Sequence, residues 1–156
     1  MHYRTLFIIT ALLVLWIPHP AIADSSPPDS IQWLTYTNAK NHNQNNRKYF
    51  IYFHIDNCPA CHMIEKKTFA DKAIIDYINS NYTPVKVNGN KEMQVASRFG
   101  VWAYPHLRFL TAEGNDIAGW PGYVESKRLL SLLEFISTDS YKNTSYKEFV
   151  NQKKNK

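Results

Sequence analysis

Two cysteines, Cys58 and Cys61, are the residues whose type and spacing most directly suggest chemistry in this chain. They are its only cysteines, and they stand in the string Cys58-Pro59-Ala60-Cys61. A structural disulfide stabilises most when it closes a long loop, and this pair would close almost none. The spacing is instead typical of a redox-active dithiol, which exchanges its disulfide with a partner. We therefore predict that the dithiol is the working part of the protein and that the reaction requires no cofactor.

The elements expected around the dithiol indicate which cysteine attacks. Residues 49–55 form a continuous apolar and aromatic run, which indicates a strand buried on both faces. From Pro59 the pattern turns helical, so Cys58 is expected where a helix begins, beside unpaired N–H groups and the positive end of the helix dipole. That environment stabilises a thiolate. We predict that Cys58 is the nucleophile and that Cys61, one turn further on, resolves the mixed disulfide.

The rest of the chain alternates between helical and strand patterns, which predicts an α/β fold. Apolar residues recur at helical spacing in some segments, and others are short apolar runs bounded by turn residues. The predicted order is α-β-α-β-α-β-β-α. The expected elements are a short helix after Ser30, the strand 49–55, helical segments from 59 and from 71, a strand over 83–87, a helix over 91–99 ended by Gly100, a hairpin of 106–110 with a strand around Ile117, and an amphipathic helix containing 129–136.

This order, with a Cys-x-x-Cys after the first strand and Tyr104-Pro105 before the hairpin, resembles the thioredoxin superfamily. Residues 61–71, 99–101 and 119–123 look like the thioredoxin-like C-terminal domain of DsbD-type thiol:disulfide interchange proteins and their single-domain periplasmic relatives. The resemblance implies a central mixed sheet flanked by helices. It also implies that Pro105 is a cis-proline packed against the dithiol, and that the backbone of Tyr104 pairs with an extended substrate chain.

The same resemblance implies the partners and the direction of the reaction. The expected substrates are protein disulfides or thiols, and the expected electron donor is a membrane protein of the DsbD type. The DsbD-like segments favour a reductase. A DsbA-like oxidase usually carries a helical insertion, and the chain between Cys58 and Pro105 is too short to contain one.

The sequence departs from the thioredoxin pattern close to the dithiol. Reductases of this family commonly carry an acidic residue six positions before the first cysteine, where this chain has Tyr52. The tryptophan that usually precedes the first cysteine is replaced by Asn57. The titratable residues near the dithiol are therefore Asp56, His54 and His62, which are candidates for proton transfer.

The N-terminus predicts an exported protein with a single domain. Residues 6–17 are almost wholly apolar and follow Arg4, and Ala21-Ile22-Ala23 resembles a cleavage site. The apolar run is shorter than the roughly 20 residues of a membrane-spanning helix, so an uncleaved anchor is the weaker alternative. The expected organisation is a signal peptide at 1–23, a linker at 24–30, a thioredoxin-like domain at 31–137 and a polar basic tail at 138–156. The expected location is the periplasm.

The net charge of +5 is only mildly basic for 156 residues. Much of the excess lies after residue 137, where a solvated, loosely ordered end explains it. No arginine-rich stripe with interleaved aromatic residues is present, so nucleic acid is not an expected partner. We expect a monomer.

Three other interpretations of the dithiol remain open. Cys58 to His62 also matches the Cys-x-x-Cys-His string of covalent c-type haem attachment, although such cytochromes are mostly helical. A zinc site made by Cys58, Cys61, His62 and His54 is a second alternative. The third is a non-enzymatic binding module that holds a partner in the groove beside the cis-proline.

Four aromatic residues are expected near that groove. They either form an apolar substrate surface or pack at the rim of the core. They are Trp102, Tyr104, Trp120 and Tyr123.

Overall fold

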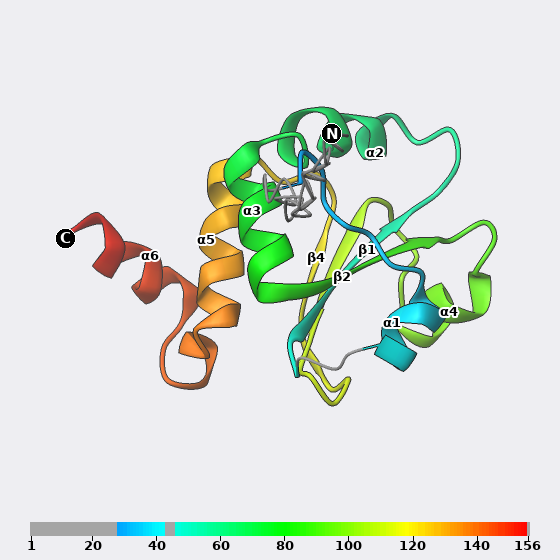
Figure 1. Ribbon diagram of the computed structural model, residues 1–156. Coiled ribbons are helices and arrows are strands. Elements are labelled where there is room, and N and C mark those ends of the chain that lie inside the picture. Colours follow the sequence, from blue (N-terminus) through cyan, green and yellow to red (C-terminus); the bar gives the residue numbers. More distant parts are fainter. Residues whose placement is uncertain (1–27, 43–45, 156) are drawn as a thin grey trace, which may run out of the picture.

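A computed structural model describes residues 28–42 and 46–155, and within them a four-stranded mixed sheet forms the centre of the fold (Figure 1). The strand order is β2-β1-β3-β4. Strand β1 pairs in parallel with β2 and antiparallel with β3, and β3 pairs antiparallel with β4. The predicted α/β fold is confirmed. The predicted signal peptide and residues 24–27 lie outside the described residues. The strands are β1 (Lys48–His54), β2 (Tyr82–Asn88), β3 (His106–Leu110) and β4 (Asp116–Pro121).

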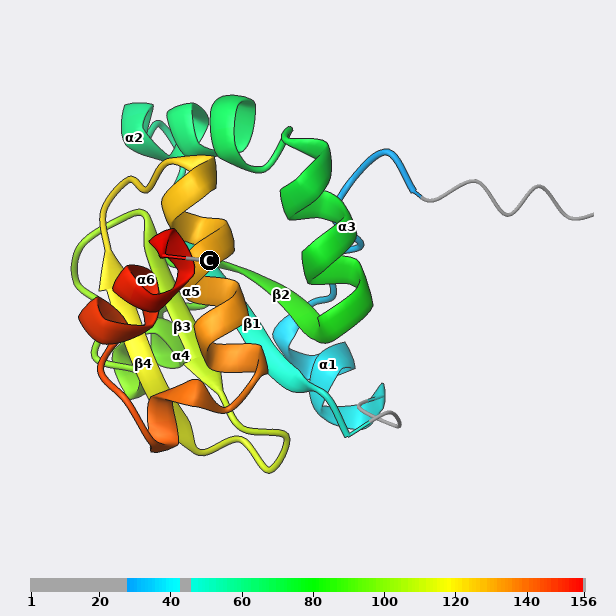
Figure 2. The same cartoon turned by 90° about the vertical axis from the view of Figure 1, so that its left-hand side faces the viewer.

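Helices flank both faces of this sheet (Figures 1 and 2). Helices α3 and α5 pack on one face, and α1 and α4 pack on the other. None of the helices in the described part of the chain combines the length and the apolar character needed to cross a membrane. The helices are α1 (Tyr36–His42), α2 (Pro59–Met63), the π-helix η1 (Ile64–Thr68), α3 (Lys72–Asn81), α4 (Met93–Arg98), α5 (Ser126–Ser137), the 3-10 helix η2 (Ser140–Lys142) and α6 (Tyr146–Lys154).

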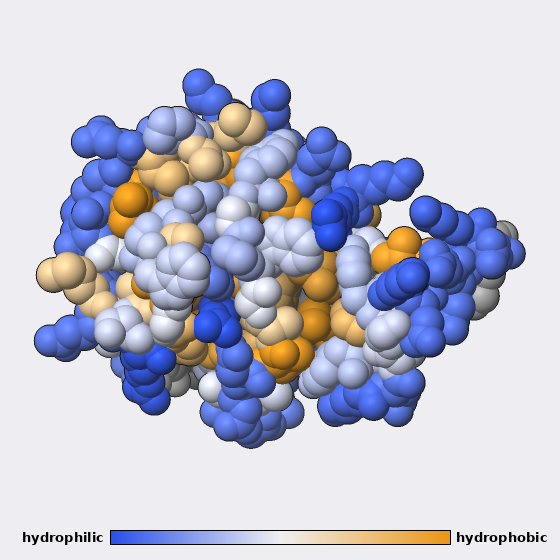
Figure 3. All heavy atoms as spheres, turned by 180° about the vertical axis from the view of Figure 1, so that it is seen from behind, coloured by the Kyte–Doolittle hydropathy of each residue, from blue (hydrophilic) through white to orange (hydrophobic). Residues whose placement is uncertain are grey.

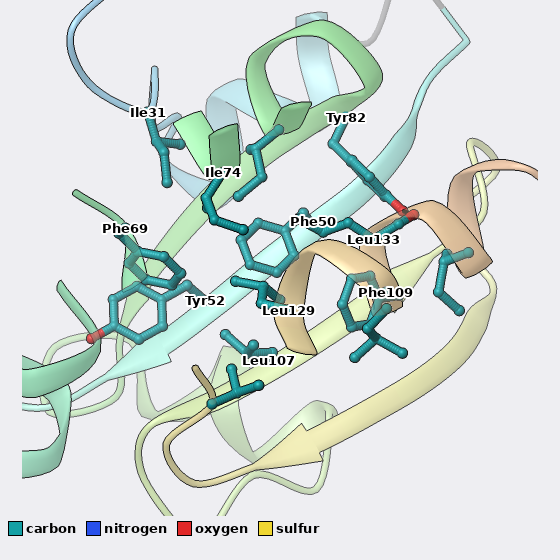
Figure 4. Close-up of a cluster of buried hydrophobic side chains, with 14 of the residues drawn as sticks. Ile31, Phe50, Tyr52, Phe69, Ile74, Tyr82, Leu107, Phe109, Leu129 and Leu133 are labelled. Carbon is teal, nitrogen blue, oxygen red and sulfur yellow. Dashed lines mark hydrogen bonds between the residues drawn. The ribbon is translucent and has the colours of Figure 1, made fainter. Parts of the chain in front are cut away.

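Strand β1 supplies both halves of the core, because successive side chains of a strand point to opposite faces. Phe50 and Tyr52 lie in the cluster under α3 and α5, which Figure 4 shows, and Ile51 and Phe53 lie in the cluster under α1 and α4. All four side chains are almost completely buried. The prediction that this strand is buried on both faces is confirmed, and its rigid setting fixes the position of the dithiol that follows it.

The segment before β1 differs from the prediction, because the helix expected directly after Ser30 begins only at Tyr36. Leu34 instead forms a parallel bridge with Val85. The Leu34 N–H donates to the Pro84 carbonyl at 2.9 Å, and the Leu34 carbonyl accepts from the Lys86 N–H at 3.0 Å. These bonds satisfy part of the otherwise open edge of β2, a tertiary gain that local helical preference cannot match.

The chain after residue 137 is not the loosely ordered end that its charge suggested. Ser145 caps α6 in a capping box with Glu148. The rings of Tyr146 and Phe149, three residues apart on one face of α6, lie 5.5 and 5.3 Å from the ring of Phe135 on α5. Cap and aromatic contacts together hold α6 against the domain. Viewed from the side opposite to Figure 1, hydrophobic side chains gather in the middle of the face and beside this C-terminal helix (Figure 3).

Candidate functional site

The dithiol lies at the carboxyl end of β1, where the chain turns into α2. Asn57, directly before the first cysteine, has a φ of 55°, a left-handed conformation that asparagine tolerates better than most residues. Cys58 is then the N-cap of α2, and Pro59 occupies the first helical turn. The predicted strand-to-helix position of Cys58 is confirmed.

Cys58 and Cys61 are joined to each other by a disulfide, and both are buried. The backbone N–H of Cys61 donates to the Sγ of Cys58 at 3.1 Å. A sulfur that accepts an N–H at the start of a helix is favoured as a thiolate. The helix continues beyond Met63 as a π-helix, a widened turn that is frequent at functional sites.

The bond between Tyr104 and Pro105 is cis, which confirms that part of the prediction. Pro105 is buried, and its carbonyl accepts from the Gly122 N–H at 2.7 Å. The Tyr104 ring covers Gly89, where an added Cβ would lie 2.6 Å from Cζ and 2.8 Å from Cε1 of that ring. The Gly89 N–H in turn donates to the His54 carbonyl at 2.7 Å. The loop of the cis-proline therefore meets the ends of β1 and β2 at the edge that carries the dithiol.

Three polar side chains form a chain of contacts that reaches the backbone of Cys61 through Tyr52. The Tyr52 hydroxyl is 3.5 Å from the Cys61 carbonyl and 3.2 Å from Oε1 of Glu65. The same Oε1 forms an ion pair with Nζ of Lys86 at 2.9 Å. In Figure 4 the Tyr52 ring belongs to the hydrophobic cluster, and its hydroxyl points out of that cluster. A carboxylate is thus present near position 52 after all, supplied by the helix and not by the strand.

Sequence reasoning missed Glu65 and Lys86, although two signals were available. Glu65 follows Cys61 by four residues, which places both on one face of a helix. Lys86 stands directly opposite Tyr52 in the parallel pairing of β1 with β2. The first signal was readable from the sequence, and the second required the register of the sheet.

Burial and the ion pair together shift the pKa values of these groups. Burial is the main cause that raises the pKa of Tyr52, so its hydroxyl keeps its proton. Burial alone would raise the pKa of Glu65, but the hydrogen bond and charge of Lys86 and the hydrogen bond from Tyr52 outweigh it, and the pKa is lowered. Burial, followed by the charge of Lys86, lowers the pKa of His54. At neutral pH the opposed charges here are therefore the Glu65 carboxylate and the Lys86 ammonium.

The predicted candidates for proton transfer have separate surroundings. The His54 ring stacks on the Tyr52 ring with centroids 5.5 Å apart. Asp56 accepts a hydrogen bond from the side-chain amide of Asn88 at 2.9 Å, and His62 is exposed. Of the three, His54 is the one that contacts Tyr52, and through it the Glu65–Lys86 ion pair.

The zinc and haem alternatives lose their structural basis. Within the residues that the structure describes, no group of three or more histidine, cysteine or acidic side chains could hold a metal ion. The haem alternative expected a mostly helical protein, whereas the dithiol follows the central strand of a mixed sheet and its two sulfurs are bonded to each other.

The four aromatic residues do not form one exposed surface. The Arg128 guanidinium lies over the Trp120 ring, with its central carbon 4.3 Å from the ring centroid. Trp120 and Tyr123 both pack against the core. Tyr104 covers Gly89 as described. Trp102 is 87% exposed, the most exposed large apolar side chain among the described residues.

Comparisons with known proteins agree with this geometry. A family model described as a thioredoxin-like domain matches residues 36–137. Comparison with curated protein sequences finds no match.

Among solved structures, a thioredoxin-fold protein from Helicobacter pylori is similar with a TM-score of 0.63 and 22% identity, covering 71% of this chain and 86% of that one. A DsbH oxidoreductase has a TM-score of 0.60 and 18% identity, covering 72% and 90%. The C-terminal domain of DsbD from Neisseria meningitidis has a TM-score of 0.51 and 16% identity, covering 63% and 85%. Identities this low show a shared fold.

Proposed function

The chain belongs to the thioredoxin-like domain family, and we propose on this premise that it is a thiol:disulfide oxidoreductase acting on protein disulfides. The observation that carries the proposal is the Cys58–Cys61 disulfide at the start of a helix, at the same edge of the sheet as the cis-proline loop. In the proposed reaction Cys58 supplies the reactive sulfur, Cys61 supplies the sulfur that resolves the intermediate, and the loop supplies a backbone surface for a partner chain.

The reaction transfers two electrons in two exchange steps. In the reduced protein the Cys58 thiolate attacks one sulfur of a partner disulfide, forms a mixed disulfide, and releases the other partner sulfur as a thiolate. The Cys61 thiolate then attacks Cys58 Sγ and displaces the first partner sulfur. The partner leaves as a dithiol, and the protein is left with the Cys58–Cys61 disulfide that the structure contains.

The roles of the two cysteines follow from their hydrogen bonding. Cys58 is the nucleophile because its Sγ accepts an N–H at the helix start, which lowers the cost of a negative charge on that sulfur. Cys61 lies one turn further inside, with its carbonyl against Tyr52, and is the resolving thiol.

The loop of Tyr104 and Pro105 is the proposed binding surface for the substrate chain. Tyr104 directly precedes the buried Pro105 and strand β3, so an extended peptide paired with its backbone would lie along the dithiol edge of the sheet. Trp102, two residues earlier, supports a polypeptide as the substrate, because folding gives no reason to expose so large an apolar side chain.

We propose that the protein acts as a monomer in the periplasm and that it is a reductase. A DsbD-type membrane donor would reduce its Cys58–Cys61 disulfide again after each reaction. The apolar N-terminal segment and its small-residue cleavage site support export. A fusion of residues 1–30 to an alkaline phosphatase that folds only after export tests the location. Phosphatase activity that depends on the apolar segment supports export, and an inactive fusion contradicts it.

Trapping of a partner on Cys58 tests the activity. Cys61→Ala cannot resolve the mixed disulfide, so partners should accumulate on it as complexes that a reducing agent dissolves. Cys58→Ala is the matched control and should trap nothing. Absence of complexes with Cys61→Ala, or equal complexes with both variants, would contradict the proposal.

The reduction potential of the dithiol tests the direction. A value near that of thioredoxin, about −270 mV, supports a reductase, and a value near that of DsbA, about −120 mV, contradicts it.

A further inference from the structure

Helix α6 lies outside the part of the chain that matches the thioredoxin-like family. The match ends at residue 137, and α6 begins at Tyr146. None of the residues of α6 is buried, so the helix adds little to the core. Its capping box and the ring contacts with Phe135 nevertheless hold it beside α5. The helix therefore shapes a surface of the protein and not its core.

A groove of about 770 Å³ runs between α5 and α6. Helix α6 leads away from α5 toward the C-terminus (Figure 1). The apolar floor of the groove consists of three partly exposed side chains, Leu130 from α5 and Tyr146 and Val150 from α6. Tyr146 and Val150 are four residues apart and so share one face of α6. The groove can therefore take up apolar side chains of a bound segment.

The rim of this groove carries positive charge that the described residues do not balance. Lys153 forms an ion pair with Glu134 across the groove. Four further cations line the groove, and none of them has an acidic partner in the described part of the chain: Lys127 and Arg128 on α5, and Lys147 and Lys154 on α6. Arg128 lies over the Trp120 ring, and Glu125 is the acidic lining residue left against the four. A bound segment must therefore supply negative charge beside its apolar side chains.

We propose that the groove between α5 and α6 binds an acidic amphipathic helix of a partner protein. The apolar face of that helix would lie on Leu130, Tyr146 and Val150, and its acidic side chains would face the cations on both rims. An apolar groove between two helices is a common receptor for an amphipathic helix. The inference goes beyond the proposed function, because neither cysteine lines the groove and binding there requires no exchange of disulfides.

Two other occupants match the groove less well. A planar anionic membrane would meet the lysines on the rim but would leave the apolar floor of a concave groove uncovered. A second copy of this chain would set the same basic rim against this one, and like charges repel. The partner helix is the occupant that satisfies the floor and the rim together.

The test uses a fluorescent synthetic peptide with leucine at positions i, i+3, i+4 and i+7 and glutamate on both sides of that stripe. Fluorescence anisotropy measures its Kd for the full chain in about 0.1 M salt, where charges more than about 10 Å away are largely screened. The combined variant Lys127→Gln, Lys147→Gln and Lys154→Gln should raise the Kd about tenfold, because three exposed charge contacts are lost. The same peptide with lysine in place of glutamate should not bind.

The matched control removes the same number of exposed positive charges from other parts of the surface. It combines Lys66→Gln, Lys91→Gln and Arg98→Gln and should leave the Kd within about twofold of its original value. Val150→Asn tests the floor and should raise the Kd roughly three- to tenfold with every charge in place, because an apolar contact is lost. On titration with the peptide, the backbone amide resonances that shift should belong to α5 and α6.

Several results would overturn the proposal. The first is a peptide that does not bind, and the second is equal weakening in the groove variant and in its matched control, which would show attraction by the net charge alone. An unchanged Kd in Val150→Asn, or resonance shifts confined to other elements, would place the peptide elsewhere. Vesicles of anionic phospholipid that bind through the same lysines when the peptide does not would identify a membrane surface as the occupant and overturn the partner helix.

Discussion

The close approach of Tyr104 to Gly89 leads to a prediction about the loop that holds the cis-proline. Gly89 is buried at the end of β2, and its N–H is bonded to the His54 carbonyl. An alanine Cβ at this position would lie 2.6 and 2.8 Å from two carbon atoms of the Tyr104 ring, closer than carbon atoms can approach. In Gly89→Ala the Tyr104 ring must therefore move, either by rotating about its own side-chain bonds or together with the loop that carries it.

The expected cost of Gly89→Ala is that of an overpacked site, about 1–3 kcal/mol of unfolding free energy. Urea unfolding measures it as a lower midpoint with an unchanged slope. The clash is with the Tyr104 side chain, so the same substitution in a Tyr104→Ala background should cost less than about 0.5 kcal/mol. The difference between the two backgrounds is the coupling energy of the pair.

An equal cost of Gly89→Ala in both backgrounds would refute this reasoning, because the strain would then lie in the backbone and not against the ring. A substitution without cost in the background that retains Tyr104 would refute it as well. Where the ring carries the loop with it, Gly89→Ala also slows exchange with a protein disulfide, because the Tyr104 backbone that we propose to pair with the substrate is displaced.

Three further predictions concern the substrate, the core and the pH dependence. Trp102→Ser should lower kcat/KM for a protein disulfide about tenfold, because one exposed aromatic contact with the polypeptide is lost. The rate with glutathione disulfide should stay unchanged, and equal losses with both substrates would contradict a contact with the polypeptide. Thr68→Val should lower the unfolding free energy measured in urea by about 1–3 kcal/mol. The buried Thr68 hydroxyl donates to the Val124 carbonyl at 2.6 Å, and the substitution removes that donor. A loss below about 0.5 kcal/mol would contradict this. The pKa of His54 is lowered in the folded protein, so the unfolded chain binds the proton more readily. The unfolding free energy should therefore fall as the pH drops below about 6.5. His54→Gln should flatten that decline, and an unchanged dependence of the unfolding free energy on pH in this variant would count against it.

The features that follow from local pattern could be predicted from the sequence. The run 49–55 is apolar at both odd and even positions, which indicates a strand buried on both faces, and β1 has that burial. Cys58 before Pro59 predicted a sulfur at the start of a helix, and the structure has it there. Tyr104-Pro105 was identified as cis through the family resemblance, because propensity alone does not predict a cis bond.

The features that depend on distant contacts could not be predicted in the same way. Leu34 lies in a segment whose sequence pattern predicts a helix, yet its backbone pairs with the edge of β2. The lysines after residue 137 suggested a solvated tail, but Phe149 packs on Phe135 of the preceding helix. At the site, Lys86 becomes relevant only through the register that sets it opposite Tyr52. In each case a contact between segments far apart in the sequence, or the register of the sheet, decides the outcome.

The catalysed reduction of a protein disulfide is the sharpest test of the proposed exchange activity. Dithiothreitol reduces the interchain disulfides of insulin slowly, and the freed chain precipitates, so turbidity reports the rate. We expect the unmodified protein to accelerate the reaction in proportion to its concentration, and Cys58→Ser to show only the rate of dithiothreitol alone. An unmodified protein without acceleration, or a Cys58→Ser variant with full acceleration, would contradict the exchange activity assigned to the dithiol.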